Sequence, residues 1–88
     1  MLEFTKRIDN KIGLHLRAAG EFVKVAAQFR SEVTVHNGDR SANGKSILGL
    51  AGLAAARGAF VRVVVEGPDE EAAQRALANL FEQNFHEE

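Results

Sequence analysis

The sequence contains no cysteine, tryptophan or tyrosine, and only one proline and one methionine among its 88 residues. The lack of cysteine excludes disulfides and thiolate metal sites, and it fits a protein of the reducing cytoplasm. The aromatic residues are all phenylalanine, which leaves little on which RNA bases could stack. Eleven basic and twelve acidic residues give a formal net charge of −1, so no cationic excess draws the chain to nucleic acid or to an anionic membrane.

Long apolar runs are also missing, and none approaches the length that crosses a membrane. The first residues, from Met1 to Lys6, do not resemble the apolar part of a secretion signal. Apolar residues make up 45% of the chain and charged residues 26%, which is ordinary for a soluble domain. A length of 88 residues suits one domain with one modest core. We therefore expect a single cytoplasmic domain that spans residues 1–88.

The alternation of apolar and polar residues predicts strands over residues 2–8, 32–36, 39–43 and 60–66. Apolar residues at helical spacing predict helices over residues 16–29, 47–56 and from Pro68 to near Gln83. Asn37-Gly38 is a strong hairpin signal between the second and third strands. The order βαββαβα predicts an α+β fold, a two-layer open-faced sandwich with a four-stranded antiparallel sheet and three helices on one face. The other face of the sheet would carry the solvent-side residues Glu3, Thr34, His36, Arg62 and Glu66.

The ends of the second helix are predicted from its terminal residues. Ser46 is a favourable N-cap, and Arg57-Gly58 has the pattern of a last-turn cation followed by a C-terminal glycine. Gly49 and Gly52 lower the helix propensity, so this helix is expected to be short or frayed. In the third helix, Pro68 is expected in the first turn, where proline is well tolerated.

One stretch departs from ordinary helix chemistry, namely Gly13-Leu14-His15-Leu16-Arg17-Ala18-Ala19 at the start of the first predicted helix. His15 stands near the N-cap, which favours Ser, Thr, Asp or Asn, and Arg17 places a cation where the helix dipole is already positive. The backbone N–H groups of Leu16, Arg17 and Ala18 would lack helical acceptors. Free amides, a positive dipole end and a guanidinium together predict a phosphate site.

His15 suits phosphoryl chemistry because neutral imidazole is a nucleophile near neutral pH. A nitrogen nucleophile forms a labile phosphoramidate, so the group would be carried and handed on. The alternative is a surface histidine that caps a helix by chance. His36 and His86 are expected on the solvent side of a strand and in the C-terminal tail, and three scattered histidines without ligand spacing predict no metal site.

Ser46 has two interpretations. Gly44-Lys45-Ser46 is similar to the end of a phosphate-binding P-loop, but that motif needs glycine at position 39, where this chain has aspartate. The nucleotide-binding interpretation therefore fails, and the N-cap explains the serine structurally. A phosphate on Ser46 would lie at a helix N-terminus, where it would add negative charge to the surface without unfolding it.

Several local strings, taken with the order of elements, resemble the HPr family, the histidine-containing phosphocarrier proteins of the bacterial phosphoenolpyruvate:sugar phosphotransferase system. The resemblance covers nearly the whole chain, and the strings that carry it are Gly13-Leu14-His15-Leu16-Arg17, Phe22-Val23-Lys24, Ser31-Glu32-Val33-Thr34-Val35, Asn37-Gly38 and Lys45-Ser46-Ile47.

The resemblance implies a stoichiometric carrier that is not an enzyme and needs no cofactor. It implies that His15 accepts a phosphoryl group from phosphorylated enzyme I and passes it to an EIIA-type acceptor, and that Arg17 binds the phosphoryl oxygens. It further implies that Ser46 is a regulatory site for an ATP-dependent HPr kinase/phosphorylase, in lineages that have one, with a transcriptional regulator as a possible partner. A monomer is expected.

The chain departs from the family pattern at two positions. Family members usually have proline where this chain has Ala18, and a small residue where it has Leu16. Loss of proline removes a conformational constraint but adds an N–H group, so we expect phosphoryl transfer to survive. Leu16 is expected to be exposed and to join a partner-binding patch, unless it folds over the start of the helix.

The predicted partner interface comprises Leu16, Lys24, Lys45, Ile47, Leu48 and Ala51. Lys11 and Arg40 could extend its basic rim. Against this interpretation, Ile47 or Leu48 would have to pack inward to hold the second helix, and isolated lysines are usually just solvated. Two other functions stay open: a mainly regulatory protein of the same family, acting in nitrogen or carbon control through phosphorylation-dependent protein binding, and an unrelated α+β module that binds a metabolite or RNA.

Overall fold

Four antiparallel strands form one sheet in the order β1-β4-β2-β3. The computed structural model describes residues 1–87, and its strands are β1 (Leu2–Arg7), β2 (Glu32–Asn37), β3 (Arg40–Asn43) and β4 (Phe60–Glu66). The predicted sheet is confirmed, with β4 between β1 and β2 although it is the last strand in the sequence.

The central strand β4 shows why alternation predicted the strands well. Val61, Val63 and Val65 are fully buried, whereas Phe60 before them and Arg62 between the first two are exposed. Val63 pairs with Phe4 on one side and with Val35 on the other, so the inward-facing positions of three strands line up on one face. This register places one face of the sheet in the core.

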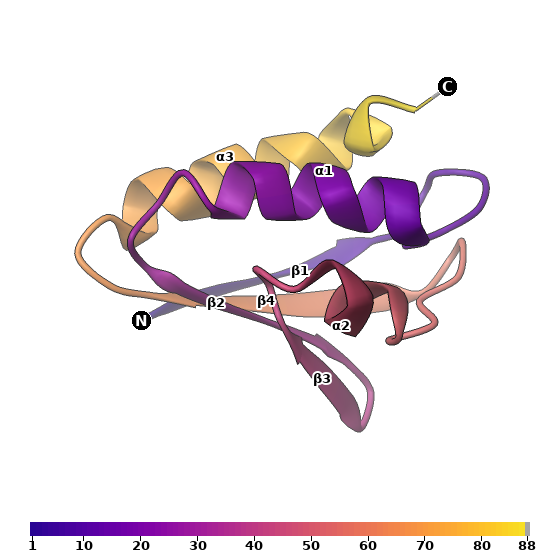
Figure 1. Ribbon diagram of the computed structural model, residues 1–88, viewed down its shortest axis with the longest axis horizontal. Helices are drawn as coiled ribbons and strands as arrows, with labels where there is room; N and C mark the ends of the chain where they lie inside the picture. The colour runs from indigo at the N-terminus through magenta and orange to yellow at the C-terminus, as the bar shows by residue number, and fades with distance from the viewer. Residues whose placement is uncertain (88) are drawn as a thin grey trace.

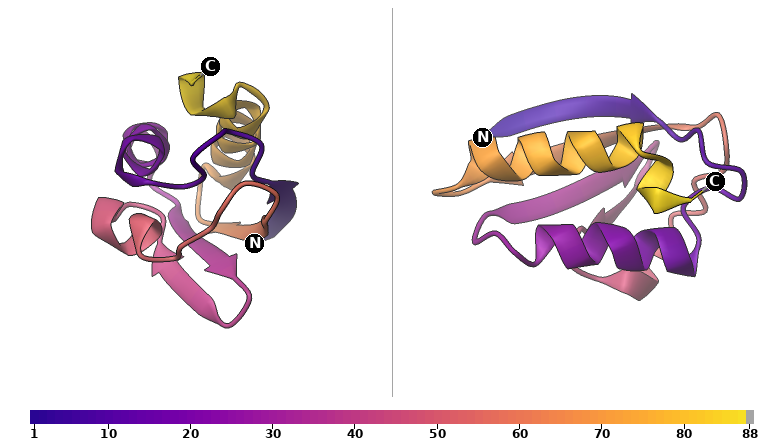
Figure 2. Two further views of the ribbon diagram at one scale, coloured as in Figure 1. Left: turned by 90° about the vertical axis from the view of Figure 1, so that its right-hand side faces the viewer. Right: turned by 90° about the horizontal axis from the view of Figure 1, so that it is seen from above.

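Three α-helices cover that face: α1 (Leu16–Ala26), α2 (Ile47–Ala51) and α3 (Glu70–Glu82). Helices α1 and α3 lie side by side over the sheet, and the short α2 lies next to α1 and β3 (Figures 1 and 2). The predicted α+β fold, with the order βαββαβα and helices on one side, is confirmed.

The core lies between the helices and the sheet. Helix α1 buries Ala18, Ala19, Phe22 and Ala26, so mostly small side chains form its buried face, and it packs beside α2 and α3. The ring of Phe81 on α3 meets the rings of Phe4, Phe22 and Phe85 edge-on, with centroid distances of 6.1, 6.1 and 4.9 Å. Such edge-to-face pairs stabilise a core beyond the area they bury.

Helix α1 ends at Ala26, three residues before the predicted end at Phe29. The chain continues in tighter turns, since Gln28 donates to the carbonyl of Val25 and Phe29 to that of Ala26. These bonds to the third preceding residue keep Phe29 against the core after the α-helix has ended. The apolar stripe therefore continues one turn beyond the helix proper.

Helix α2 is much shorter than residues 47–56, and the predicted end at Arg57-Gly58 is wrong. It ends at Ala51 with Gly52 as C-cap, consistent with the low helix propensity of glycine. A second cause is tertiary, because the carbonyl of Ala55 accepts a hydrogen bond from the amide of Leu14 at 2.8 Å. The loop that precedes α1 thus forms a hydrogen bond with Ala55, which lies in the segment that a longer α2 would have contained.

Helix α3 begins at Glu70, so Pro68 precedes the helix and does not lie in its first turn as predicted. The sequence also gave no indication of the short 3₁₀ turn η1 (Asn84–His86), which buries Phe85. None of the helices within residues 1–87 combines the length and the apolar content that crossing a bilayer requires.

Candidate functional site

The loop between β1 and α1 fixes the position of His15. Gly13 adopts a φ of 85°, which favours glycine, and Leu14 buries its side chain while its amide bonds to the carbonyl of Ala55. His15 then follows in an extended conformation as the N-cap of α1, and its carbonyl accepts the amide of Ala19 at 2.8 Å. The imidazole is therefore held at the N-terminus of a helix that packs one face on the core.

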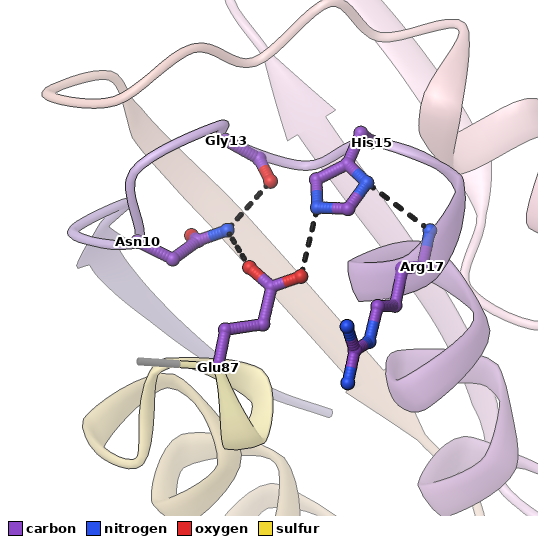
Figure 3. A network of polar contacts seen from close by, with 5 residues as sticks. All are labelled: Asn10, Gly13, His15, Arg17 and Glu87. Carbon is purple, nitrogen blue, oxygen red and sulfur yellow. Dashed lines mark hydrogen bonds and ion pairs between the residues drawn. The ribbon is translucent and has the colours of Figure 1, made fainter.

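The two ring nitrogens of His15 have opposite hydrogen-bonding roles (Figure 3). Nδ1 lies 3.3 Å from the backbone amide of Arg17, which can only donate, so Nδ1 presents its lone pair to the helix. Nε2 lies 2.8 Å from Oε2 of Glu87, and a carboxylate can only accept, so Nε2 carries the proton. The side chain of His15 is 28% exposed, which leaves the ring open to a partner.

Two further amides point out of the first turn of α1. Among the residues that the structure describes, neither the amide of Leu16 nor that of Ala18 has an acceptor, and the guanidinium of Arg17 has no hydrogen-bonding partner. The structure thus brings His15, Arg17 and the three predicted amides together. Free amides at a helix N-terminus, beside a cation, can receive the oxygens of a phosphoryl group.

Glu87 and Asn10 belong to this site, although sequence analysis did not identify them. Oε1 of Glu87 accepts from Nδ2 of Asn10 at 2.8 Å, and the same amide nitrogen donates to the carbonyl of Gly13 at 2.7 Å. Asn10 is almost fully buried. An asparagine three residues before a glycine is a turn signal that could have identified Asn10, but the sequence has no comparable signal for Glu87.

An open recess of about 230 Å³ lies beside the imidazole. Four of its seven lining residues are alanines, and the lining consists of Ile12, Leu14, His15, Ala51, Ala54, Ala55 and Ala56. Of the predicted interface, only Ala51 takes part in this lining.

Three large apolar side chains of the predicted interface are exposed: Leu16 by 58%, Ile47 by 42% and Leu48 by 78%. The alternative that Leu16 folds over the helix start is therefore wrong, and so is the expectation that Ile47 or Leu48 packs inward. Leu50, which is fully buried, holds α2 to the core instead. Leu16 on α1 and Ile47 and Leu48 on the neighbouring α2 therefore leave apolar surface exposed.

The two lysines of the predicted interface are both exposed but differ in their contacts. Nζ of Lys24 lies 3.3 Å from Glu21 one turn earlier on α1. Nζ of Lys45 donates to the carbonyl of Phe29 at 2.8 Å. Phe29 follows the C-terminal end of α1, whereas His15 lies at the N-terminal end of that helix. The structure therefore directs the ammonium group of Lys45 away from the imidazole.

Ser46 is the N-cap of α2, as predicted, and its Oγ accepts the amide of Gly49 at 3.1 Å. A side chain on Gly49 would begin 3.0 Å from that oxygen, so glycine leaves room for the serine. Ser46 lies at the opposite end of α2 from Ala51, which lines the recess beside His15. As for metals, within residues 1–87 no three His, Asp or Glu side chains gather as ligands.

Comparisons with known proteins agree with this geometry. A family model described as the PTS HPr component phosphorylation site matches residues 2–83. The chain is 47% identical over 87 residues to a phosphocarrier protein HPr of Neisseria meningitidis, covering 99% of this chain and 98% of the relative. It is 36% identical to a phosphocarrier protein NPr of Shewanella violacea, covering 98% and 94%.

Solved structures give the same result. The chain superimposes on a crystal structure of HPr-C-His from Thermoanaerobacter tengcongensis with a TM-score of 0.94 and 43% identity, covering 100% and 99% of the two chains. A crystal structure described as an HPr dimer from the same organism matches with a TM-score of 0.78 and 42% identity, covering 99% and 100%.

Proposed function

This chain belongs to the HPr family of phosphocarriers of the bacterial phosphotransferase system, and we propose that Nδ1 of His15 is the atom that carries its phosphoryl group. Proteins of this family are carriers and not enzymes. In our proposal the phosphoryl group comes from phosphorylated enzyme I, ultimately from phosphoenolpyruvate, and passes to an EIIA-type domain. No cofactor takes part.

The orientation of the imidazole is the single observation that best supports this assignment. Nδ1 keeps its lone pair toward the N-terminus of α1, because it accepts from the amide of Arg17 while Nε2 is paired with Glu87. Its contact with the amide is long, at 3.3 Å, so the lone pair can be withdrawn from it easily. An incoming phosphorus atom would replace a weak hydrogen bond with a covalent bond.

The phosphoryl oxygens would be bound by groups at the start of α1, of which, within residues 1–87, only the amide of Arg17 has an acceptor, Nδ1 of His15. The amides of Leu16, Arg17 and Ala18 would point at these oxygens, and the guanidinium of Arg17 would add a charge-assisted contact. Leu16 and Arg17 are exposed, whereas Ala18 is buried, and contacts made at exposed sites are moderate in strength. Moderate binding suits a carrier, since a tightly held phosphoryl group could not be transferred.

The exposed side chains of Leu16, Ile47 and Leu48 would dock enzyme I and the acceptor around the imidazole. The recess beside His15 adds an opening that a small partner side chain could enter. Lys24 could add a cationic contact at the rim, whereas Lys45 would first have to leave the carbonyl of Phe29. The partner interface is therefore centred on the N-terminus of α1 and on α2.

The experiment that tests the proposal is incubation with phosphoenolpyruvate and enzyme I. The wild-type protein should gain one acid-labile phosphoryl group, and His15→Ala should gain none. His36→Ala is the matched control and should be labelled like the wild type, since His36 lies on the sheet. Labelling that persists in His15→Ala would contradict the assignment.

Regulation through Ser46 is a second proposal, and it depends on a kinase in the host. Its support is the half-buried hydroxyl at the N-cap of α2, next to the exposed Ile47 and Leu48. A phosphate there would place negative charge in the docking surface, where it would repel an acidic partner. An acid-stable label from ATP and HPr kinase/phosphorylase, abolished by Ser46→Ala, is the expected result.

The mainly regulatory alternative, in nitrogen or carbon control, would use the same phosphohistidine to switch protein binding. The match to the phosphocarrier NPr shows that this sequence is similar to more than one named carrier type, and both names describe phosphocarriers. We propose the carrier function for a cytoplasmic monomer. A sedimentation measurement on the protein tests the monomer, since one similar structure is described as a dimer.

A further inference from the structure

The last turn of the chain has an unusual backbone that brings Glu87 back to the start of α1. Asn84, Phe85 and His86 have φ angles of 52°, 56° and 63°. Residues with side chains rarely adopt this left-handed conformation, and consecutive ones persist only where the surroundings enforce it. Figures 1 and 2 show the turn lying above the N-terminal end of α1.

Phe85 provides the enforcing contact. Its side chain is 1% exposed, and its ring lies 4.9 Å from the ring of Phe81. Burial of this side chain fixes the turn against the core, and Glu87 follows two residues later. The carboxylate is thereby placed by packing and not by a chance conformation of the chain end.

Both oxygens of the Glu87 carboxylate are occupied, and its side chain is only 13% exposed. Oε1 accepts from Asn10 at 2.8 Å, and Oε2 lies 2.8 Å from Nε2 of His15. Asn10 is itself held by the carbonyl of Gly13 (Figure 3). The order Asn10, Glu87, His15 is that of an orienting group, a carboxylate and a reacting imidazole.

The charge balance of the transfer gives this carboxylate a role. The lone pair of Nδ1 forms a bond to phosphorus while the bond from phosphorus to the donor histidine nitrogen breaks, and that nitrogen keeps the electron pair. The ring of His15 retains the proton on Nε2 and so gains one positive charge. A carboxylate hydrogen-bonded to the far nitrogen of an imidazole stabilises such a cation.

We propose that Glu87 is a positioning residue for His15, which fixes the proton on Nε2 and balances the positive charge that the ring acquires with the phosphoryl group. The proposal rests on the phosphocarrier function proposed above. Transfer to the acceptor returns the ring to neutrality, so the same carboxylate acts on loading and unloading. Removal of its charge should lower the stability of the loaded form.

Three variants test this proposal. Glu87→Gln keeps an oxygen that can accept from Nε2 but removes the charge, and Glu87→Ala removes both. Glu82→Gln is the matched control, because Glu82 is also a C-terminal carboxylate in an ion pair, with Lys6 at 2.9 Å, and does not contact His15. Thermal unfolding of each variant shows whether the fold is retained.

The first measurement uses potassium phosphoramidate, a small donor that needs no docking surface, and the second uses the equilibrium with phosphorylated enzyme I. In Glu87→Gln we expect the rate of phosphorylation and the phosphorylated fraction at equilibrium each to fall by about tenfold. This is the lower end of the effect of one neighbouring charge, which suits a carboxylate that is partly exposed. Glu82→Gln should match the wild type. Equal results for Glu87→Gln and Glu82→Gln would overturn the proposal.

A third measurement needs no donor. Two-bond ¹H–¹⁵N spectra of the His15 ring report which nitrogen carries the proton. The wild type and Glu87→Gln should show the proton on Nε2 alone, and Glu87→Ala should show the second tautomer as well. An unchanged spectrum in Glu87→Ala would contradict the positioning role. If the wild type did not take up a phosphoryl group, the carrier function would be contradicted. The spectra need no phosphoryl group, so they would still show whether Glu87 fixes the proton on Nε2 of His15.

Discussion

A side chain on Gly13 would begin 2.5 Å from the carbonyl oxygen of Ala55 and 3.0 Å from Cα of Ala56. The loop that carries His15 therefore lies directly on the backbone that follows α2. The amide of Leu14 bonds to the same carbonyl at 2.8 Å. This close approach, together with the positive φ of Gly13, connects the position of the imidazole to a segment 40 residues later in the sequence.

Gly13→Ala should therefore destabilise the protein and disturb the site. The clash involves backbone atoms that cannot move away easily, and the φ of 85° is unfavourable for alanine. We expect the free energy of unfolding to fall by about 1–3 kcal/mol, measured by urea denaturation. Gly20→Ala is the control, since Gly20 lies in α1 with no atom within 4 Å of an added Cβ. It should gain about 0.5–1 kcal/mol, and a loss as large as that of Gly13→Ala would contradict this account.

Ala18→Pro tests the departure from the family pattern. The amide of Ala18 has no acceptor within residues 1–87, so proline there removes no intramolecular hydrogen bond. We expect the free energy of unfolding to rise by about 0.4–1 kcal/mol, because proline restricts the unfolded chain. His15 should still be phosphorylated by enzyme I, at a rate within about tenfold, since a single hydrogen bond contributes about 0.5–1.5 kcal/mol.

Ala19→Pro is the matched control for that variant. The amide of Ala19 bonds to the carbonyl of His15 at 2.8 Å, and its side chain is fully buried. Proline at this position should cost about 3 kcal/mol or more. If Ala18→Pro and Ala19→Pro had similar free energies of unfolding, the amides of these two residues would not differ in hydrogen bonding as the structure shows.

Leu48 and Leu50 separate docking from folding within one short helix. Leu48 is 78% exposed and Leu50 is fully buried. Leu48→Ala should change the free energy of unfolding by no more than about 0.5 kcal/mol but weaken the affinity for enzyme I, measured by calorimetry. Leu50→Ala should cost about 2–5 kcal/mol of stability. If Leu48→Ala bound enzyme I like the wild type, the docking surface would lie elsewhere.

Asp69 makes stability depend on pH. The hydroxyl of Ser31 and the amides of Arg30 and Ser31 donate to its carboxylate, and these hydrogen bonds lower the pKa of Asp69 below its ordinary value. Because the pKa is lower in the folded state, the stabilisation is fully present above about pH 4 and is lost as the pH falls through the folded value. Unfolding curves of the wild type should therefore show falling stability in acid.

Ser31→Ala should reduce that acid dependence, because it removes the largest contribution to the lowered pKa of Asp69. Asp39→Asn, in the exposed turn between β2 and β3, is the control and should leave the acid slope unchanged. An acid slope in Ser31→Ala equal to that of the wild type would show that these hydrogen bonds do not set the pH dependence.

The strands could be predicted closely from the sequence because each has one buried and one solvent-facing side. The predicted range of residues 60–66 coincides with β4, whose alternating valines report the buried face directly. The end of α2 could not be predicted, since it depends on the hydrogen bond between Leu14 and Ala55. Local propensity does not report a contact between segments so far apart in the chain.

The functional site could likewise be predicted only in part. His15 and Arg17 break the preferences of a helix start, so their local sequence marks them. Glu87 contacts His15 across 72 residues through a left-handed turn, and nothing in the sequence of that turn predicts its backbone. Exposure of Ile47 and Leu48 could not be decided either, because either residue or Leu50 could have been the buried one.

The most direct test of the central claim is the site of the N–P bond. After incubation with phosphoenolpyruvate and enzyme I, ¹H–¹⁵N and ³¹P spectra of the ¹⁵N-labelled protein identify which nitrogen of His15 is bonded to phosphorus. The orientation of the ring toward the amide of Arg17 predicts Nδ1. A phosphoryl group on Nε2 would contradict the account, because that nitrogen is the one paired with Glu87.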